Sequence, residues 1–281
     1  MKKILVPTDF SDNSKHALAA AAKIARAWKA QLVVMHANVE AAYVSPLAEY
    51  SGSPNFNMTD YEAVAAEQLF ALKNDLLSKP EFNGLDIETV VVEGYLHTAL
   101  QNAAKEEGAD LIVMGTKGAT GATEFFVGSN TEKVIRTAAC PVLSIPADGP
   151  DVEAIKMVAM PSTLKEDQMI VFEQLATWQK VFNFGVKVVY LNNPAGFKEE
   201  GDIEVAAAQF AEKAGLKDVS VFISTNTFNE EAAILQFAET NDADLIAMGT
   251  HQRKGLSHVI FGSLTEDTVN HSNIPVLSIP L

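Results

Sequence analysis

The sequence predicts an α/β protein made of two tandem open sandwiches, each with a parallel sheet of five strands covered by helices on both faces. Short apolar runs alternate with segments whose apolar residues recur at helical spacing. The short runs are apolar at nearly every position, which is typical of parallel strands buried on both faces. A set of motifs also recurs at one constant offset, so the second unit is expected to repeat the fold of the first.

The repeat has an offset of 134 residues. Met114-Gly115-Thr116 returns as Met248-Gly249-Thr250, and the run Pro-Val-Leu-Ser-Ile-Pro at 141–146 returns at 275–280. So many matches at one offset indicate duplication. We expect a first domain at 1–146, a second at 154–281, and a linker at 147–153, where turn-forming residues replace apolar periodicity.

Strands and helices of the first unit follow from the apolar pattern. Strands are expected at residues 4–6, 32–35, 87–92, 111–114 and 142–145. Apolar residues at helical spacing predict helices covering 17–25, 61–77, 99–105 and 131–138, the last of which Pro141 prevents from continuing. In the second unit the corresponding strands are 157–159, 187–190, 219–223, 245–248 and 276–279.

The first unit is longer by about twenty residues, and residues 38–57 are the expected place for the insertion. This stretch contains two prolines and three aromatic residues and is expected to form a long surface loop after the second strand. Long loops often act as lids or contact surfaces. An insertion without a role is the alternative.

The composition excludes some classes of function. The formal net charge is −15, and both units are acidic, with −5 in residues 1–146 and −10 in the remainder. A nucleic-acid-binding surface is therefore not expected, and an anionic ligand would depend on backbone amides and helix N-termini. Cys140 is alone, which excludes an intramolecular disulfide and fits a core residue in a reducing cytoplasm. Without a signal-peptide pattern or a long apolar run, we expect no membrane association.

Residues that could bind a ligand follow two of the predicted strands. In open α/β sheets, ligands bind at the carboxyl ends of strands where the connections diverge. Pro7-Thr8-Asp9 follows the first strand, and Gly115, two residues, Gly118, nine residues and Gly128-Ser129 follow the fourth. Glycines allow tight turns and a close approach of main-chain amides to phosphate.

The start of the next helix and Asp9 complete this pattern. Gly128-Ser129-Asn130-Thr131 opens a helix and offers unpaired amides and hydroxyls to phosphate oxygens. The Asp9 carboxylate suits sugar hydroxyls or a divalent metal, although either Asp9 or Ser11 could simply cap the following helix. His36 is interpreted as a structural hydrogen-bonding residue, because no His or Cys pairs at ligand spacing suggest a metal site. The set indicates a nucleoside polyphosphate.

These residues resemble those of the universal stress protein family. The family's nucleotide-binding members carry Gly, two residues, Gly, nine residues and Gly-Ser/Thr, and this pattern is met at Gly115, Gly118, Gly128 and Ser129. The opening Ile4-Leu5-Val6-Pro7-Thr8-Asp9 and the ending Pro141-Val142-Leu143 are similar as well. The resemblance covers the chain as a tandem pair and implies a Rossmann-like fold of the adenine nucleotide alpha hydrolase type.

The resemblance also implies a ligand and its contacts. It implies ATP, often with Mg²⁺ or Mn²⁺, hydrolysed slowly or not at all. Adenine and ribose would be contacted by Pro7, Thr8, Asp9, Ala37, Met114 and Gly115. The phosphates would lie over Gly118, Gly128, Ser129, Asn130 and Thr131.

The second unit departs from the pattern at two positions. Gln252 stands where the first unit has Gly118, and Thr163 where it has Asp9. A side chain at the first position blocks close main-chain approach, and the second change removes a carboxylate. We therefore expect the second unit to have lost ATP binding, although Gly249, Gly262 and Ser263 remain and His251, Arg253 and Lys254 could supply charge instead.

The functional expectation is a stress-response protein that binds ATP in its first domain as a nucleotide-dependent regulatory module. Two alternatives stay open: an interaction scaffold that needs no nucleotide, and a slow ATPase. No nucleophile elbow, P-loop or dinucleotide fingerprint is present, and no general base is evident, so no catalytic residue is assigned. The similar apolar final strands are expected to pair with each other as an intramolecular pseudo-dimer, and a homodimer stays open.

Overall fold

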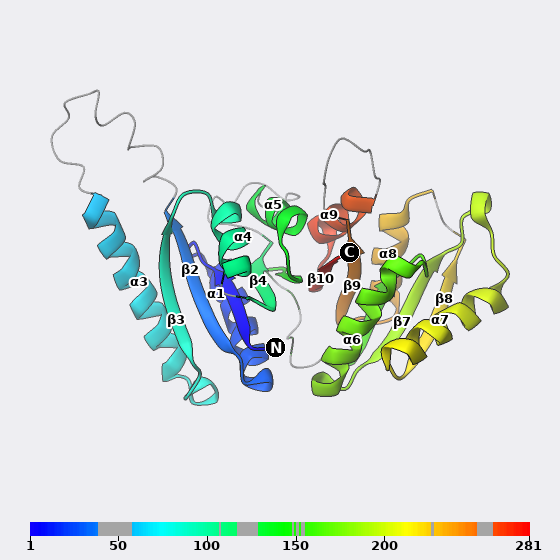
Figure 1. Ribbon diagram of the computed structural model, residues 1–281, viewed down its shortest axis with the longest axis horizontal. Coiled ribbons are helices and arrows are strands. Elements are labelled where there is room, and N and C mark those ends of the chain that lie inside the picture. The colour runs from blue at the N-terminus through cyan, green and yellow to red at the C-terminus, as the bar shows by residue number, and fades with distance from the viewer. Residues whose placement is uncertain are drawn as a thin grey trace, which may run out of the picture.

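The computed structural model describes residues 1–38, 58–106, 108–116, 129–147, 149, 152, 155–225, 228–251 and 261–281. Strands and helices alternate through the described parts of the chain (Figure 1), and the α/β class is confirmed. The predicted insertion at 38–57 lies outside the described residues, except for Asn38 at the end of the second strand. Each helix in the described ranges is too short or too polar to span a lipid bilayer.

All five predicted strands of the first half are present, with helices between them. The elements are β1 (Lys3–Pro7), α1 (Asp12–Trp28), β2 (Gln31–Asn38), α3 (Met58–Ser78), β3 (Ile87–Glu93), α4 (Leu96–Glu106), β4 (Leu111–Gly115), α5 (Ser129–Thr137) and β5 (Val142–Ile145).

The second half repeats this order. Its elements are β6 (Met157–Pro161), α6 (Met169–Phe182), β7 (Gly185–Leu191), α7 (Glu200–Ala214), β8 (Val219–Ser224), α8 (Glu230–Thr240), β9 (Leu245–Thr250), α9 (Phe261–His271) and β10 (Val276–Pro280). β5 ends at Ile145 and β6 begins at Met157, and the predicted linker at 147–153 lies between these two strands. The exact domain limits remain a prediction.

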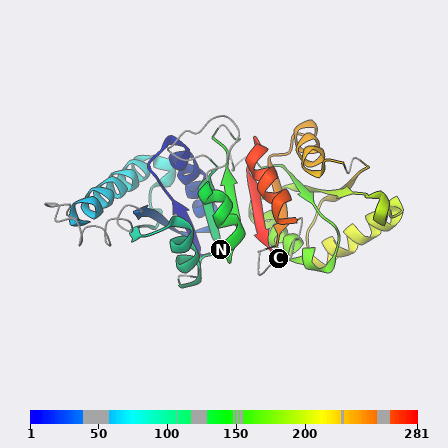
Figure 2. The same ribbon diagram turned by 90° about the horizontal axis from the view of Figure 1, so that it is seen from above.

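The ten strands of the described residues form one continuous sheet with the order β3-β2-β1-β4-β5-β10-β9-β6-β7-β8. Neighbouring strands are parallel within each half. β5 and β10 pair antiparallel, with Leu143 opposite Leu277, which confirms that the two final strands pair with each other. The halves therefore lie side by side around this central pair (Figure 2).

The strand residues alternate between two apolar layers, one on each face of the sheet. Ile4 and Val6 pack with α1 and α3, whereas Leu5 packs with α4 and α5. In the second half, α6 and α7 cover the first of these faces and α8 and α9 the other. Because both faces are covered, the strands need apolar residues at most positions, which is the pattern seen in the sequence.

Helices α5 and α9 meet above the central strand pair and share an ion pair. The Arg136 guanidinium donates from Nε and Nη2 to the two carboxylate oxygens of Glu266, and from Nη2 to Glu132 Oε1 at 2.5 Å. Glu266 is buried, with 6% of its surface exposed. The hydrogen bond to Glu266 is the main cause that raises the pKa of Arg136. This contact fixes one half against the other beyond the strand pairing.

Cys140 is buried beside the central strands, as expected for a core residue. Burial is the main cause that raises the pKa of its thiol to about 12. The side chain is therefore a neutral thiol at physiological pH and is poorly suited to nucleophilic chemistry.

Candidate nucleotide site and its counterpart in the second half

The strand ends that carry the predicted site residues are neighbours in the sheet. β1 lies between β2 and β4, and Pro7 is in register with Met35. Leu5 is in register with Ile112, so the carboxyl ends of β1 and β4 are neighbours. β1 and β4 connect onward to helices on opposite faces, which makes the gap between their carboxyl ends the switch point of this sheet.

Thr8 shapes the loop that leaves β1. Its side chain is buried, its Oγ1 accepts from the Phe10 amide at 3.0 Å, and it shares a hydrogen bond of 3.0 Å with Ser14 Oγ. The Thr8 amide donates to the Met35 carbonyl at 2.8 Å. Phe10 takes a positive φ of 63°, which a phenylalanine adopts only when its surroundings enforce it. Thr8 therefore supports the loop with its hydroxyl.

Asp9 lies on the exposed side of the same loop. Its Oδ1 accepts from the Ser11 amide at 3.1 Å and from Ser11 Oγ at 2.5 Å. Ser11 is the N-cap of α1, and its Oγ accepts from the Ser14 amide at 3.2 Å. Of the two residues that could cap this helix, Ser11 does so, and Asp9 orients the cap while its carboxylate faces solvent.

His36 and Ala37 belong to the neighbouring strand β2. His36 Nδ1 lies 2.8 Å from the Thr8 carbonyl oxygen, and its ring stacks on Phe10 with centroids 4.6 Å apart. These contacts confirm the interpretation of His36 as a structural residue. Ala37 follows it, half-buried, at the carboxyl end of the sheet next to the β1 loop.

Gly115 brings β4 against the start of α1 and the start of α5. A Cβ at Gly115 would lie 3.1 Å from the Asn13 carbonyl oxygen, so the missing side chain allows helix and strand to touch. The buried Thr131 hydroxyl donates to the Gly115 carbonyl at 3.0 Å. The Thr131 side chain thus ties α5 to the strand, which leaves its main-chain amide as the group that could face a ligand.

The other predicted phosphate contacts are described only in part. Ser129 is the first residue of α5, and Asn130 is exposed beside it. Gly118 and Gly128 lie outside the described residues. Pro7, Thr8, Asp9, Ala37, Met114, Gly115 and the start of α5 are therefore brought to one edge of the sheet, and the glycine loop remains a prediction.

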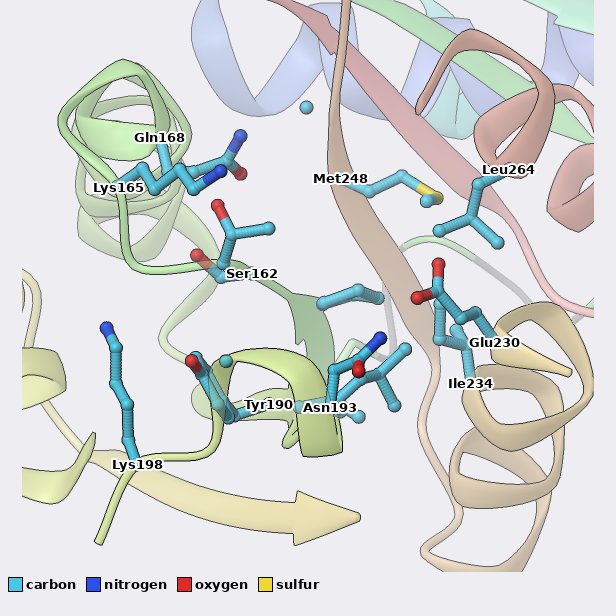
Figure 3. A pocket seen from close by; sticks show the side chains of 16 residues that line it. Ser162, Lys165, Gln168, Tyr190, Asn193, Lys198, Glu230, Ile234, Met248 and Leu264 are labelled. Atoms are coloured by element: carbon cyan, nitrogen blue, oxygen red, sulfur yellow. The ribbon is translucent and has the colours of Figure 1, made fainter. Parts of the chain in front are cut away.

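In the second half, a cavity of about 430 Å³ lies at the corresponding edge (Figure 3). Its lining includes the counterparts of seven residues predicted to bind the nucleotide in the first half. Around the first strand these are Pro161 for Pro7, Ser162 for Thr8, Thr163 for Asp9 and Leu191 for Ala37. Around the fourth strand they are Met248 for Met114, Gly249 for Gly115 and Leu264 for Asn130. The cavity falls within the usual size range of small-molecule sites. Sequence reasoning treated this half as a degraded copy and did not predict the cavity.

The loop geometry after β6 repeats that after β1. Ser162 Oγ accepts from the Leu164 amide at 3.1 Å, and Leu164 has a φ of 52°. Thr265 is completely buried, and its Oγ1 lies 3.4 Å from the Gly249 carbonyl, as Thr131 relates to Gly115. The two halves therefore share one main-chain frame around this site.

The charged side chains in the second-half cavity differ from those of the first half. Lys165 and Lys198 lie on one side, and Glu230 at the start of α8 lies on the opposite side (Figure 3). Lys165 stands where the first half has Ser11, and Glu230 where it has Leu96. The Lys198 ammonium lies 5.8 Å from the centre of the Tyr190 ring. The charged residues at these two positions are visible in the sequence. They indicate a different ligand site only once the structure shows that their side chains face the cavity.

Among the described residues, no three His, Cys, Asp or Glu side chains gather as a metal site. Asp9 is the predicted residue with a carboxylate at this edge of the first half. A divalent cation there would need ligands from the nucleotide phosphates as well, which is how Mg²⁺ is usually held with nucleotides.

Comparisons with known proteins agree with this architecture. The model of the universal stress protein family matches residues 1–146 and 187–280. A universal stress protein of Methanocaldococcus jannaschii is 36% identical over 146 residues, which is 51% of this chain and 81% of that protein. One from Synechocystis is 25% identical over 299 residues, covering 99% of each chain.

The fold is also found among solved structures. The crystal structure of a universal stress protein from Archaeoglobus fulgidus matches with a TM-score of 0.73 and 19% sequence identity, covering 99% of this chain and 98% of that one. At this identity the likeness shows the fold alone. The full-length matches show that the tandem arrangement has close architectural parallels. Since the family model covers most of both halves, the chain belongs to the universal stress protein family.

Proposed function

We propose that this stress protein binds one ATP, with Mg²⁺ or Mn²⁺, at the carboxyl edge of the first-half sheet and acts as a nucleotide-dependent regulatory module. The observation that carries the proposal is the convergence of Pro7-Thr8-Asp9, Met114-Gly115 and the start of α5 at the switch point. This is where open α/β sheets bind their ligands. The cavity at the equivalent edge of the second half supports the same location.

The chemistry of these residues fits the parts of a nucleotide. The first amides of α5 have no partners within the helix and can donate to phosphate oxygens. Asp9 is exposed and acceptor-only when ionised, so it suits ribose hydroxyls or the cation. A bound cation would neutralise phosphate charge and would be held by Asp9 together with the nucleotide. We assign no general base and therefore propose binding rather than turnover.

We propose that the second half does not hold a triphosphate. Thr163 lacks the carboxylate of Asp9, and Gln252 replaces the glycine of the phosphate loop. Glu230 adds a negative charge, but Lys165 and Lys198 line the same cavity, so the proposal depends on the missing carboxylate and the missing glycine rather than on the charge of the cavity. The expected stoichiometry is therefore one nucleotide per chain.

Thermal unfolding with millimolar ATP and Mg²⁺ tests the proposal, with calorimetry for stoichiometry. At a ligand concentration of 100 Kd, binding stabilises the folded state by about 2.7 kcal/mol. Gly118→Val should abolish the shift by blocking phosphate approach, and Asp9→Ala should weaken it, whereas Thr163→Asp should change little. Absence of a shift in the unmodified chain, or a shift lost on changing the second-half cavity instead, would contradict the proposal.

A further inference from the structure

A second cavity lies in the first half, away from the candidate nucleotide site. It has a volume of about 340 Å³ and is formed between α4 and the face of β2 and β3 that α4 covers. Val33, Val90 and Ala103 contribute apolar surface, and Glu88, Glu93 and Glu106 contribute carboxylates. None of these six residues belongs to the predicted ATP site.

The second half fills the corresponding place with its own side chains. Phe222 and Phe237 stand where the first half has Val90 and Ala103, and their rings pack with centroids 4.7 Å apart. Lys187 stands where the first half has Val33, and its ammonium lies 5.8 Å from the centre of the Phe237 ring. One half therefore holds two aromatic rings and a cation where the other half holds a cavity.

The carboxylates of the cavity are also confined to the first half. The counterparts of Glu88, Glu93 and Glu106 are Ser220, Thr225 and Thr240, all uncharged. The three glutamates line the cavity and are exposed, so their charges lie where the cavity meets solvent. The cavity contains no basic side chain among its described lining residues. The first half therefore combines an apolar interior with an acidic opening at this cavity. The aligned positions of the second half have neither feature.

We propose that this cavity binds a small aromatic ammonium compound. The ring would occupy the space beside Val33, Val90 and Ala103, which the second half fills with phenylalanine rings. The ammonium group would lie at the opening, near the three glutamates. Burial of the ring would provide most of the affinity, and the charges would provide selectivity for cations over anions.

Tryptamine and indole-3-propionate are the probes, because they share an indole ring and carry opposite charges. Titration of the full-length chain by calorimetry or NMR should show one tryptamine site. We expect it to bind tryptamine at least about tenfold more tightly than indole-3-propionate, since several weak ion pairs together reach about 1.4 kcal/mol. The preference should decrease as salt is raised.

Two sets of variants localise the site. The double variant Val90→Phe, Ala103→Phe copies the residues of the second half and should abolish tryptamine binding. Exchange of Glu88, Glu93 and Glu106 for Gln should remove the preference for the cation while weak ring binding persists. The control changes exposed glutamates elsewhere, Glu204, Glu212 and Glu239, to Gln and alters the net charge equally.

The titrations and the variants can each overturn the proposed site. Equal affinity for both probes, or tryptamine binding that survives the double phenylalanine variant, would overturn the proposal. Equal loss of selectivity in the control would show that net charge, and not this cavity, governs binding. The three exposed glutamates can be changed without disturbing the core, so the test stands even if the double variant folds poorly. ATP binding in the first-half site should be unchanged in the glutamine variants.

Discussion

Both halves of the chain keep the loop that leaves their first strand, but they differ in the side chains that the loop presents. Thr8 and Ser162 each accept a hydrogen bond from the amide two residues ahead, and Phe10 and Leu164 each adopt a positive φ. Between them stand Asp9 in one half and Thr163 in the other. In both halves a side-chain hydrogen bond holds the loop in the same main-chain conformation, whereas the side chain at the position in between differs in charge.

The contact between α5 and α9, which joins the two halves, also differs between them in its side chains. Glu132 and Glu266 are equivalent residues on α5 and α9, but Arg136 corresponds to Asn270. A single arginine therefore binds both glutamates. In a pair of identical halves each would supply its own arginine, so this arrangement is available only to a tandem chain whose halves have diverged.

Removing Arg136 should have the largest effect on stability. Arg136→Ala leaves Glu266, which is 6% exposed, without its charged partner. Loss of one partner of a buried pair costs about 3–5 kcal/mol, and because a third of the Arg136 side chain is exposed we expect about 2–3 kcal/mol, measured by urea unfolding. Lys133→Ala, on the exposed side of α5, is the control. An equal loss in the control would show that the asymmetric contact is unimportant.

The two strand-end glycines should differ in their tolerance of alanine. At Gly115 the added Cβ would meet the Asn13 carbonyl oxygen at 3.1 Å, and this atom belongs to the main chain of α1. At Gly249 it would meet the tip of the Leu281 side chain at 2.6 Å, which can rotate away. We expect Gly115→Ala to cost about 1–2 kcal/mol and Gly249→Ala less, measured by chemical unfolding. The reverse order would mean that Leu281 is held more firmly than α1.

The helix caps give the smallest predicted difference. Ser11 caps α1 through its side chain, whereas Lys165 at the equivalent position makes no such bond and is followed by a short 3₁₀ turn at Glu166–Gln168. Ser11→Ala should cost about 1 kcal/mol, and Lys165→Ala should leave stability nearly unchanged. Thermal unfolding of both variants measures this. A comparable loss at Lys165 would indicate that its side chain stabilises the second half by another route.

The sequence by itself determined the elements and their repetition. Every predicted strand is present. Three of the four helices predicted in the first half fall within longer observed ones, as 17–25 does within α1 and 61–77 within α3, whereas the helix predicted at 131–138 runs one residue past the end of α5. These predictions succeed because apolar periodicity, caps and prolines act over a few neighbouring residues. The constant offset of 134 made the second half predictable from the first. The sequence also identified His36 as a structural residue, because no ligand-spaced partner accompanies it, and Cys140 as a core residue, because it is the single cysteine.

The tertiary structure alone decided which distant groups meet. The antiparallel register of β5 with β10, the ion pair of Arg136 with Glu266 and the approach of Gly115 to Asn13 join residues from separate elements. The two cavities depend on the same kind of information, since a position such as Val90 or Lys165 shows its role only when its neighbours across the sheet are known. Packing between elements is set by shape and charge over the whole fold, and local sequence patterns do not contain it.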